Sequence, residues 1–162
     1  ADKYKTNLSV VRTVIQSNNK RVILHTKRID KIIGRKMKNK KIAFLGVTFK
    51  PNTDDMRDST SLKMIPYLCK KGVHVSYYDP TGEKEVFKKI KNCKFEKDVK
   101  ANCKNADLII LHTEWDEFKI IDLKKISKNK NIKVYDLRNL YNFKEMSNKK
   151  INYYSVGRPD VN

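Results

Sequence analysis

The run Lys41-Ile-Ala-Phe-Leu-Gly46 begins the part of the sequence that decides the fold. Its apolar side chains stand at consecutive positions instead of alternate ones, and a glycine ends it. Such a run is typical of a strand buried on both faces of a parallel sheet. A second run of this kind, Asp107-Leu-Ile-Ile-Leu-His112, is the clearest strand in the chain. Together they predict the centre of a parallel sheet.

Strand and helix patterns alternate on both sides of these runs. Pro66 stands in the middle of one expected helix, where we expect a kink or a late helix start because proline removes a backbone donor. The alternation predicts an α/β fold with an open, mostly parallel, Rossmann-like sheet and helices on both faces. The further expected strands are 73–78, 132–135 and 152–156, and the expected helices are 59–71, 83–90, 99–103, 115–118 and 122–128.

One long helix is expected before the first strand. Apolar residues recur at helical spacing from Asn7 to about Ile33, and Gly34 is placed to end the helix, with a break near Ser17 to Asn19 as an alternative. The helix is long for a small domain, so a connecting or subunit-pairing role competes with ordinary packing. We expect a boundary between 1–36 and 37–162. The apolar positions are Leu8, Val11, Val14, Ile15, Val22, Ile23, Ile29, Ile32 and Ile33.

The chain has 162 residues, enough for one domain with a core, and a formal net charge of +19. An anionic partner such as nucleic acid is the first interpretation of that charge. The lysines are scattered through every segment, however, and no aromatic residues are interleaved with them as a stacking platform requires. A lysine-rich solvated surface is favoured, and a nucleic-acid-binding module remains the alternative.

The cysteines argue against a disulfide-stabilised protein and against a metal-binding one. Cys69, Cys93 and Cys103 are odd in number, form no CxxC pair and have no histidine at metal-ligand spacing. A reduced, cytoplasmic protein without a metal site is expected, with Cys69 and Cys103 as buried or half-buried small hydrophobes. The sequence has neither a membrane-spanning apolar stretch nor a secretory signal at Ala1.

Ligands of open α/β sheets bind at the carboxyl ends of the strands. The segments there are 49–57, 113–115 and 136–139. Lys50, Arg57 and Arg138 offer positive charge for a diphosphate, and Phe49 and Trp115 offer flat faces for a ring. The alternative is structural: Asp54 and Asp55 cap the next helix or pair with Arg57, and Trp115 belongs to the core.

The first strand is followed by one glycine, Gly46, where a dinucleotide-binding turn needs three. Asp79 is therefore interpreted as a turn residue before Pro80 instead of a ribose ligand, and we expect no NAD binding by this domain alone. No motif pairs a histidine with a nucleophile, so His25, His74 and His112 are interpreted as ordinary surface or core residues and no catalytic residue is expected.

The segment KIAFLGVTFKPNTDDMRDS at 41–59 resembles the start of the C-terminal domain of the UDP-glucose and GDP-mannose dehydrogenase family. The resemblance continues through KKGVHVSYYDP at 70–80, ADLIILHTEWDEFK at 106–119, YDLRNLY at 135–141 and YYSVGRP at 153–159. The helix containing Asn18 and Asn19 resembles the end of the family's central dimerisation helix. The resemblance thus implies a C-terminal UDP-sugar-binding domain at 37–162.

The resemblance also implies site residues. Arg57 is expected to reach the NAD pyrophosphate held by another domain, and Arg138 to contact substrate, with Leu137 in place of the family's usual glycine. The remaining expected substrate contacts lie in one loop and are Phe49, Lys50, Pro51, Asn52, Thr53, Asp54, Asp55 and Met56.

The family reaction takes an alcohol to a carboxylate by two NAD-dependent hydride transfers through a cysteine adduct. The family's catalytic cysteine lies in a GGxC context that surrounds none of the three cysteines here, and its NAD glycine loop is also missing. We therefore expect this chain to be inactive alone, with NAD bound mainly elsewhere. The resemblance implies UDP-glucose as substrate, polysaccharide biosynthesis as the setting and a homodimer through the long helix. A GDP-mannose-type substrate is the alternative.

Overall fold

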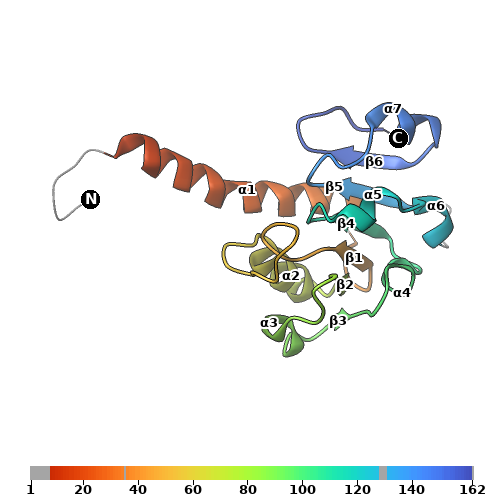
Figure 1. Cartoon of the computed structure of the whole chain (residues 1–162), viewed down its shortest axis with the longest axis horizontal. Coiled ribbons are helices and arrows are strands. Elements are labelled where there is room, and N and C mark those ends of the chain that lie inside the picture. Colours follow the sequence, from red (N-terminus) through yellow and green to blue (C-terminus); the bar gives the residue numbers. More distant parts are fainter. Residues whose placement is uncertain (1–7, 35, 128–130, 162) are drawn as a thin grey trace.

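The computed structural model describes residues 8–34, 36–127 and 131–161. Its centre is a six-stranded sheet in the order β3-β2-β1-β4-β5-β6, and every strand pair is parallel (Figure 1). This is the order of a doubly wound Rossmann-like fold, so the predicted sheet is confirmed. The strands are β1 Lys41–Leu45, β2 His74–Tyr78, β3 Cys93–Phe95, β4 Leu108–Leu111, β5 Lys133–Asp136 and β6 Asn152–Ser155.

Helices cover both faces of the sheet, as predicted. Ile42 and Phe44 of β1 point into one core beneath the first three helices, whereas Ala43 and Leu45 point into a second core beneath the other four. Consecutive residues are buried on opposite faces, which explains the unbroken apolar runs. The helices are α1 Ser9–Ile33, α2 Ser61–Lys70, α3 Glu85–Lys88, α4 Val99–Cys103, α5 Asp116–Lys119, α6 Leu123–Ile126 and α7 Phe143–Asn148.

Some expected elements differ from the structure. The edge strand β3 and helix α7 were not expected, and α1 runs without the break considered near Ser17. Helix α2 begins at Ser61 and continues through Pro66. Burial of Met64 and Leu68 outweighs the missing proline donor. The expected helix limits Asn7 and Lys128 lie outside the described residues.

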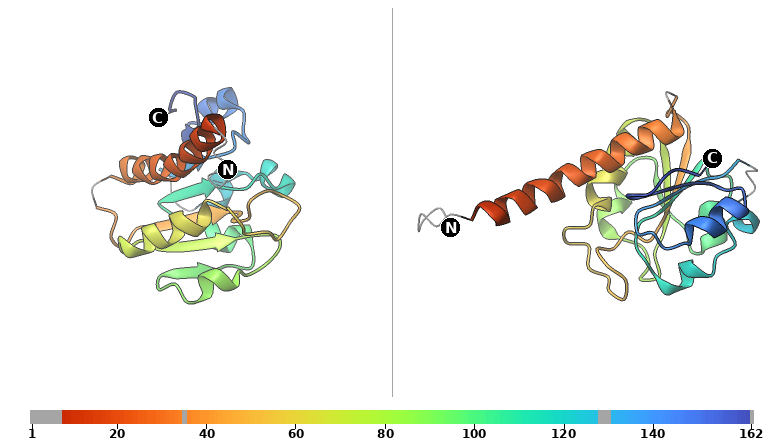
Figure 2. Two further views of the ribbon diagram at one scale, coloured as in Figure 1. Left: turned by 90° about the vertical axis from the view of Figure 1, so that its left-hand side faces the viewer. Right: turned by 90° about the horizontal axis from the view of Figure 1, so that it is seen from above.

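Only the C-terminal half of α1 packs on the domain. His25 Nδ1 lies 2.7 Å from the hydroxyl of Tyr135, and Arg28 pairs with Asp160. The N-terminal half projects away from the sheet (Figures 1 and 2). Four of its apolar residues continue the buried face of the helix but are exposed, and we call them the apolar stripe: Leu8, Val11, Val14 and Ile15.

Gly46 ends β1 at a point where the chain passes very close to the loop after β4. Its φ is +75°, and a side-chain Cβ at this position would lie 2.5 Å from the Cβ of Thr113. Both the left-handed backbone and the close approach require glycine. This glycine therefore fixes how closely the ends of β1 and β4 approach each other.

We predict that Gly46→Ala lowers the free energy of unfolding far more than Gly82→Ala. Gly82 has a similar φ of +86°, but a Cβ there meets nothing within 4 Å. The control variant therefore carries only the backbone cost of about 1–2 kcal/mol, whereas Gly46→Ala adds an overpacking cost of about 1–3 kcal/mol. Urea denaturation followed by circular dichroism measures both. Equal losses would contradict the close contact.

Candidate functional site

The strands β1 and β4 are neighbours at the centre of the sheet, where the order of the strands reverses. Crevices at this position of doubly wound sheets bind ligands. Here the two following loops are tied together, since the Thr113 hydroxyl donates to the carbonyl oxygen of Thr48 at 2.8 Å. The backbone N–H of His112 also donates to the carbonyl oxygen of Leu45 at 3.0 Å. This edge of the sheet is therefore well ordered.

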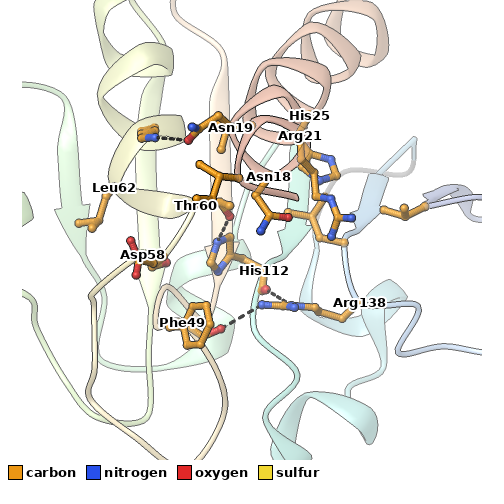
Figure 3. A pocket seen from close by; sticks show the side chains of 16 residues that line it. Asn18, Asn19, Arg21, His25, Phe49, Asp58, Thr60, Leu62, His112 and Arg138 are labelled. Carbon is orange, nitrogen blue, oxygen red and sulfur yellow. Dashed lines mark hydrogen bonds between the residues drawn. The ribbon is translucent and has the colours of Figure 1, made fainter. Parts of the chain in front are cut away.

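A pocket of about 610 Å³ opens at this edge, between α1, the start of α2 and the loops after β1, β4 and β5 (Figure 3). Its volume lies in the usual range for small-molecule sites, about 300–1,000 Å³. Polar and cationic side chains alternate with apolar ones around it. The lining residues are Ile15, Asn18, Asn19, Arg21, Val22, His25, Phe49, Asp58, Ser59, Thr60, Leu62, Lys63, His112, Leu137, Arg138 and Val156.

Arg138 is held at the junction of three loops. Its Nε donates to the carbonyl oxygen of His112 at 2.8 Å and lies 3.0 Å from Glu114 Oε2. Its Nη2 donates to the carbonyl oxygen of Phe49 at 3.1 Å. These bonds fix the plane of the guanidinium against the pocket, as Figure 3 shows. A fixed guanidinium is suited to bind an oxyanion because little side-chain entropy is lost on binding.

His112 is buried at the floor of the pocket. Its Nε2 lies 2.8 Å from the Thr60 hydroxyl, and its Nδ1 lies 3.1 Å from that of Thr113. Burial, followed by the charge of Arg138, lowers the pKa of His112 to about 3. The ring is therefore neutral at physiological pH, and it joins the loop after β4 to the residue preceding α2.

His25 lies in the pocket wall formed by α1. Burial, followed in order of effect by the charges of Arg21, Arg28 and Arg138, lowers the pKa of His25 to about 4. The Tyr135 hydroxyl is its hydrogen-bond partner. A neutral histidine surrounded by three arginines is sensitive to any negative charge that enters the pocket.

The loop expected to contact substrate only partly reaches this pocket. Phe49, 47% exposed, lines it together with Arg138. The loop folds on itself, since the backbone N–H of Phe49 donates to the carbonyl oxygen of Asp55 at 3.0 Å. Met56 packs against the core beneath α1 and α2. Other members of the loop that do not line the pocket are Lys50, Pro51, Asn52, Thr53, Asp54 and Arg57.

Arg57 is paired within its own loop. Its Nε and Nη2 donate to the Asp55 carboxylate at 3.0 and 2.8 Å. The Arg57 side chain holds the pKa of Asp55 at about 2, and both groups are at the surface. The structural alternative, a pair between these two residues, is therefore the one seen.

The core alternative for Trp115 is seen as well, because Trp115 is 8% exposed within the core on the face of α4.

The pocket wall on α1 was not expected from the sequence. Asn18, Arg21 and His25 stand three and four residues apart, on or beside the face that carries Val22 and Ile29 into the core. Polar residues that interrupt the apolar face of a helix are a signal for a lined cavity. His112 gave a second signal, because it directly follows a buried strand at the ligand-binding edge.

The loop after β5 keeps a normal backbone at the position where the family's motif has glycine. Leu137 lines the pocket, and the left-handed residue of this loop is Asn139, with φ of +54°. Leucine therefore meets no backbone strain here.

Asp79 is occupied by donors of the protein itself. Its Oδ2 accepts from the backbone N–H groups of Val47 at 2.8 Å and Thr48 at 3.3 Å. Its Oδ1 accepts from the backbone N–H of Thr81 at 3.1 Å and lies 3.6 Å from Lys84 Nζ. Asp79 thus forms the expected turn and also braces the loop after β1.

The described residues contain no group of three acidic, histidine or cysteine side chains able to hold a metal ion. No helix among them is long and apolar enough to cross a membrane. Cys69 and Cys103 are buried, as predicted. The cytoplasmic location inferred from the cysteines stays a prediction.

Comparison with known proteins identifies the fold and the family. The chain is 35% identical over 161 residues to a UDP-glucose 6-dehydrogenase of Rhizobium meliloti, covering 99% of this chain and 37% of the relative. The structure superposes on a UDP-D-ManNAc dehydrogenase from Pyrococcus horikoshii with a TM-score of 0.74 at 21% identity, over 95% of this chain and 35% of that one.

A UDP-glucose dehydrogenase from Pyrobaculum islandicum gives a TM-score of 0.70 at 20% identity, over 83% of this chain and 30% of that one. The chain thus spans about a third of the length of its relatives. The sequence profile of the UDP-glucose/GDP-mannose dehydrogenase family, UDP binding domain, matches residues 43–143. This chain therefore belongs to the UDP-glucose/GDP-mannose dehydrogenase family and carries its UDP-binding domain.

Proposed function

We propose that the pocket holds the UDP part of UDP-glucose and that this chain is the nucleotide-binding portion of a UDP-glucose 6-dehydrogenase. The observation that carries the proposal is the fixed guanidinium of Arg138 at the strand ends. Arg21 and Lys63 add positive charge to the same pocket, so its three cations exceed two carboxylates, Asp58 in the lining and Glu114 paired with Arg138. This charge balance favours a diphosphate over a neutral or cationic ligand.

The pocket also has an aromatic face for the remainder of the ligand. Phe49 is exposed beside the Arg138 guanidinium, and Leu137 and Val156 add apolar surface. A nucleotide needs both parts, because its phosphates need cations and its base needs a flat apolar contact. Asn18 and Asn19 on α1 carry amide groups able to read the edge of a base.

The remaining loop residues are proposed to close on the bound ligand. Lys50 is exposed directly after Phe49, and Pro51 through Met56 follow. Arg57 is proposed to contact the NAD pyrophosphate held by another domain. Its bond to Asp55 is an ion pair at the surface, where solvent screens the attraction, so exchanging Asp55 for a phosphate is feasible.

In the complete reaction, UDP-glucose, water and NAD⁺ give UDP-glucuronate and NADH. NAD supplies two hydride acceptors, and a cysteine outside these residues carries the adduct. The role proposed for this chain is to hold the nucleotide so that C6 of the sugar meets the reacting groups. Alone, the chain is expected to be inactive.

We predict that the isolated chain binds UDP and not NAD in isothermal titration calorimetry. Arg138→Lys should weaken UDP binding about tenfold or more, because lysine lacks the fork that donates two parallel hydrogen bonds. Arg57→Lys is the matched control and should leave UDP affinity unchanged, since Arg57 does not line the pocket. Thermal unfolding of both variants checks the fold.

Tight NAD binding without a response to UDP would refute the proposal. A GDP-mannose-type substrate is tested in the same titration, because GDP should then displace UDP at lower concentration.

We predict that UDP-glucose binding takes up a proton at His25. The diphosphate offsets the charges of Arg21, Arg28 and Arg138, so it raises the pKa of His25 above its free value of about 4. Because the bound state then holds the proton more tightly, affinity rises as pH falls. A rise of one to two pKa units gives about twofold to tenfold tighter binding at pH 5 than at pH 7.

Calorimetry in buffers of different ionisation enthalpy measures this proton uptake. UDP-glucose is used because each of its phosphates carries one ester and one anhydride bond, so neither has the second proton that titrates near pH 6 in phosphomonoesters. His25→Gln keeps a side chain able to bond to the Tyr135 hydroxyl but should remove the pH dependence. An unchanged pH profile in this variant would assign the effect elsewhere.

We further propose that 1–36 forms the end of a central helix that pairs two copies, with 37–162 as the UDP-sugar-binding domain. The apolar stripe supports this proposal, because it extends the buried face of α1 beyond the end of the domain. Four neighbouring apolar side chains on a projecting helix form a patch that is typical of an interface.

We predict that the chain dimerises and that Val14→Asp weakens the dimer at least tenfold. Val14 belongs to the apolar stripe and is 53% exposed. Ile23→Asp is the matched control, since Ile23 is 54% exposed but lies on a different face of α1. Sedimentation equilibrium gives both dissociation constants. A monomeric wild type, or equal effects of the two variants, would refute pairing through this face.

A further inference from the structure

Two cysteines approach each other on the face of the sheet covered by α1 and α2. Cys93 begins β3 and pairs in register with Val75 of β2. In-register residues of parallel strands point to the same face, and Val75 belongs to the core beneath α2. Cys69 lies in the last turn of α2 and belongs to the same core. The two side chains therefore enter one cluster from two different elements.

The position of the Cys69 sulfur is defined by the start of β3. Its Sγ donates to the carbonyl oxygen of Asn92 at 3.7 Å. The same carbonyl oxygen accepts from the backbone N–H of Val75 at 2.8 Å. Asn92 directly precedes Cys93, and each of the two thiols shifts the pKa of the other. The two side chains are therefore neighbours within one cluster, as an S–S bond of about 2 Å requires.

The third cysteine lies apart. Cys103 is on α4, in the core on the opposite face of the sheet, and is fully buried. The sheet itself separates it from Cys69 and Cys93. An oxidant can therefore join Cys69 to Cys93, whereas Cys103 has no neighbouring thiol among these three cysteines.

We propose that Cys69 and Cys93 form an intramolecular disulfide under oxidising conditions, which links the end of α2 to the edge strand β3. With hydrogen peroxide as oxidant, one thiolate attacks a peroxide oxygen, giving a sulfenic acid and hydroxide. The second sulfur then attacks the sulfenic sulfur and releases the hydroxyl group, which leaves as water. Two thiols and one peroxide give one disulfide and two waters.

The surroundings favour Cys69 as the first thiolate. The Cys93 thiol donates its hydrogen bond to Cys69, which lowers the pKa of Cys69 and raises that of Cys93. The oxidant reaches the two thiols from the side of Cys93, which is partly exposed. Strand β3 has three residues and pairs only with β2 among the described strands. A short edge strand opens at low cost, so it admits the oxidant and accommodates the closing movement.

The test treats the full chain with hydrogen peroxide, alkylates the remaining thiols under denaturing conditions and measures the intact mass. The expected result is a loss of about 2 Da, the two thiol hydrogens, with one alkylated cysteine and a Cys69–Cys93 peptide in the digest. The bridge encloses the segment between α2 and β3, so the melting temperature should rise by about 5–10 °C and return after dithiothreitol.

Cys103→Ser is the matched control and should lose the same mass, with no thiol left to alkylate. The variants Cys69→Ser and Cys93→Ser should not show this loss of mass. If either variant fails to fold, the corresponding alanine variant is used instead. Addition of oxygen to the wild type without the loss of about 2 Da would overturn the proposal. A bridge that includes Cys103, or one between two chains, would overturn it as well.

Discussion

The arrangement of the site depends on the close contact between β1 and β4 at their carboxyl ends. The backbone at Gly46 lies so close to Thr113 that no side chain fits at position 46. The two loops that follow β1 and β4 can therefore share hydrogen bonds. His112 then reaches the residue that precedes α2, and Arg138 reaches both loops from β5. One position without a Cβ thereby determines the relative placement of three strand ends and the start of a helix.

This placement also determines the electrostatics of the pocket. His112 is buried and His25 is half-buried, and their lowered pKa values keep both rings neutral, so they contribute hydrogen bonds without adding charge. The positive charge comes from Arg21 on α1, Lys63 on α2 and Arg138 in the loop after β5. Like charges from separate elements repel one another until an anion enters. The proposed diphosphate would therefore be bound by the pocket as a whole and not by one residue.

The sequence allowed the sheet to be predicted because its central strands are buried on both faces. Leu108–Leu111 and Ile42–Leu45 are apolar and buried at every position, as expected for strands covered on both faces. The edge strand Cys93–Phe95 has only three residues, with a lysine at its centre, so its sequence shows no strand-like pattern of apolar residues. Helix α7 was missed for a similar reason, since it has six residues and depends on its cap at Asn142.

The site could be predicted only where it depends on strand ends. Phe49 and Arg138 lie in the loops after β1 and β5, and both line the pocket. The residues from Lys50 to Arg57 could not be placed, because hydrogen bonds within the loop, above all between Asp55 and Arg57, decide where they point. The wall on α1 required the tertiary structure, since the helix approaches this edge from outside the sheet.

The same helix connects the pocket to the surface that projects from the domain. Ile15 lines the pocket and belongs to the apolar stripe, while Asn18 and His25 continue that face towards the core. A partner bound to the stripe, as proposed above, would change one wall of the pocket, and the proposed nucleotide would change the surface offered to that partner. Because such effects are reciprocal in free energy, the two proposed binding events would be coupled.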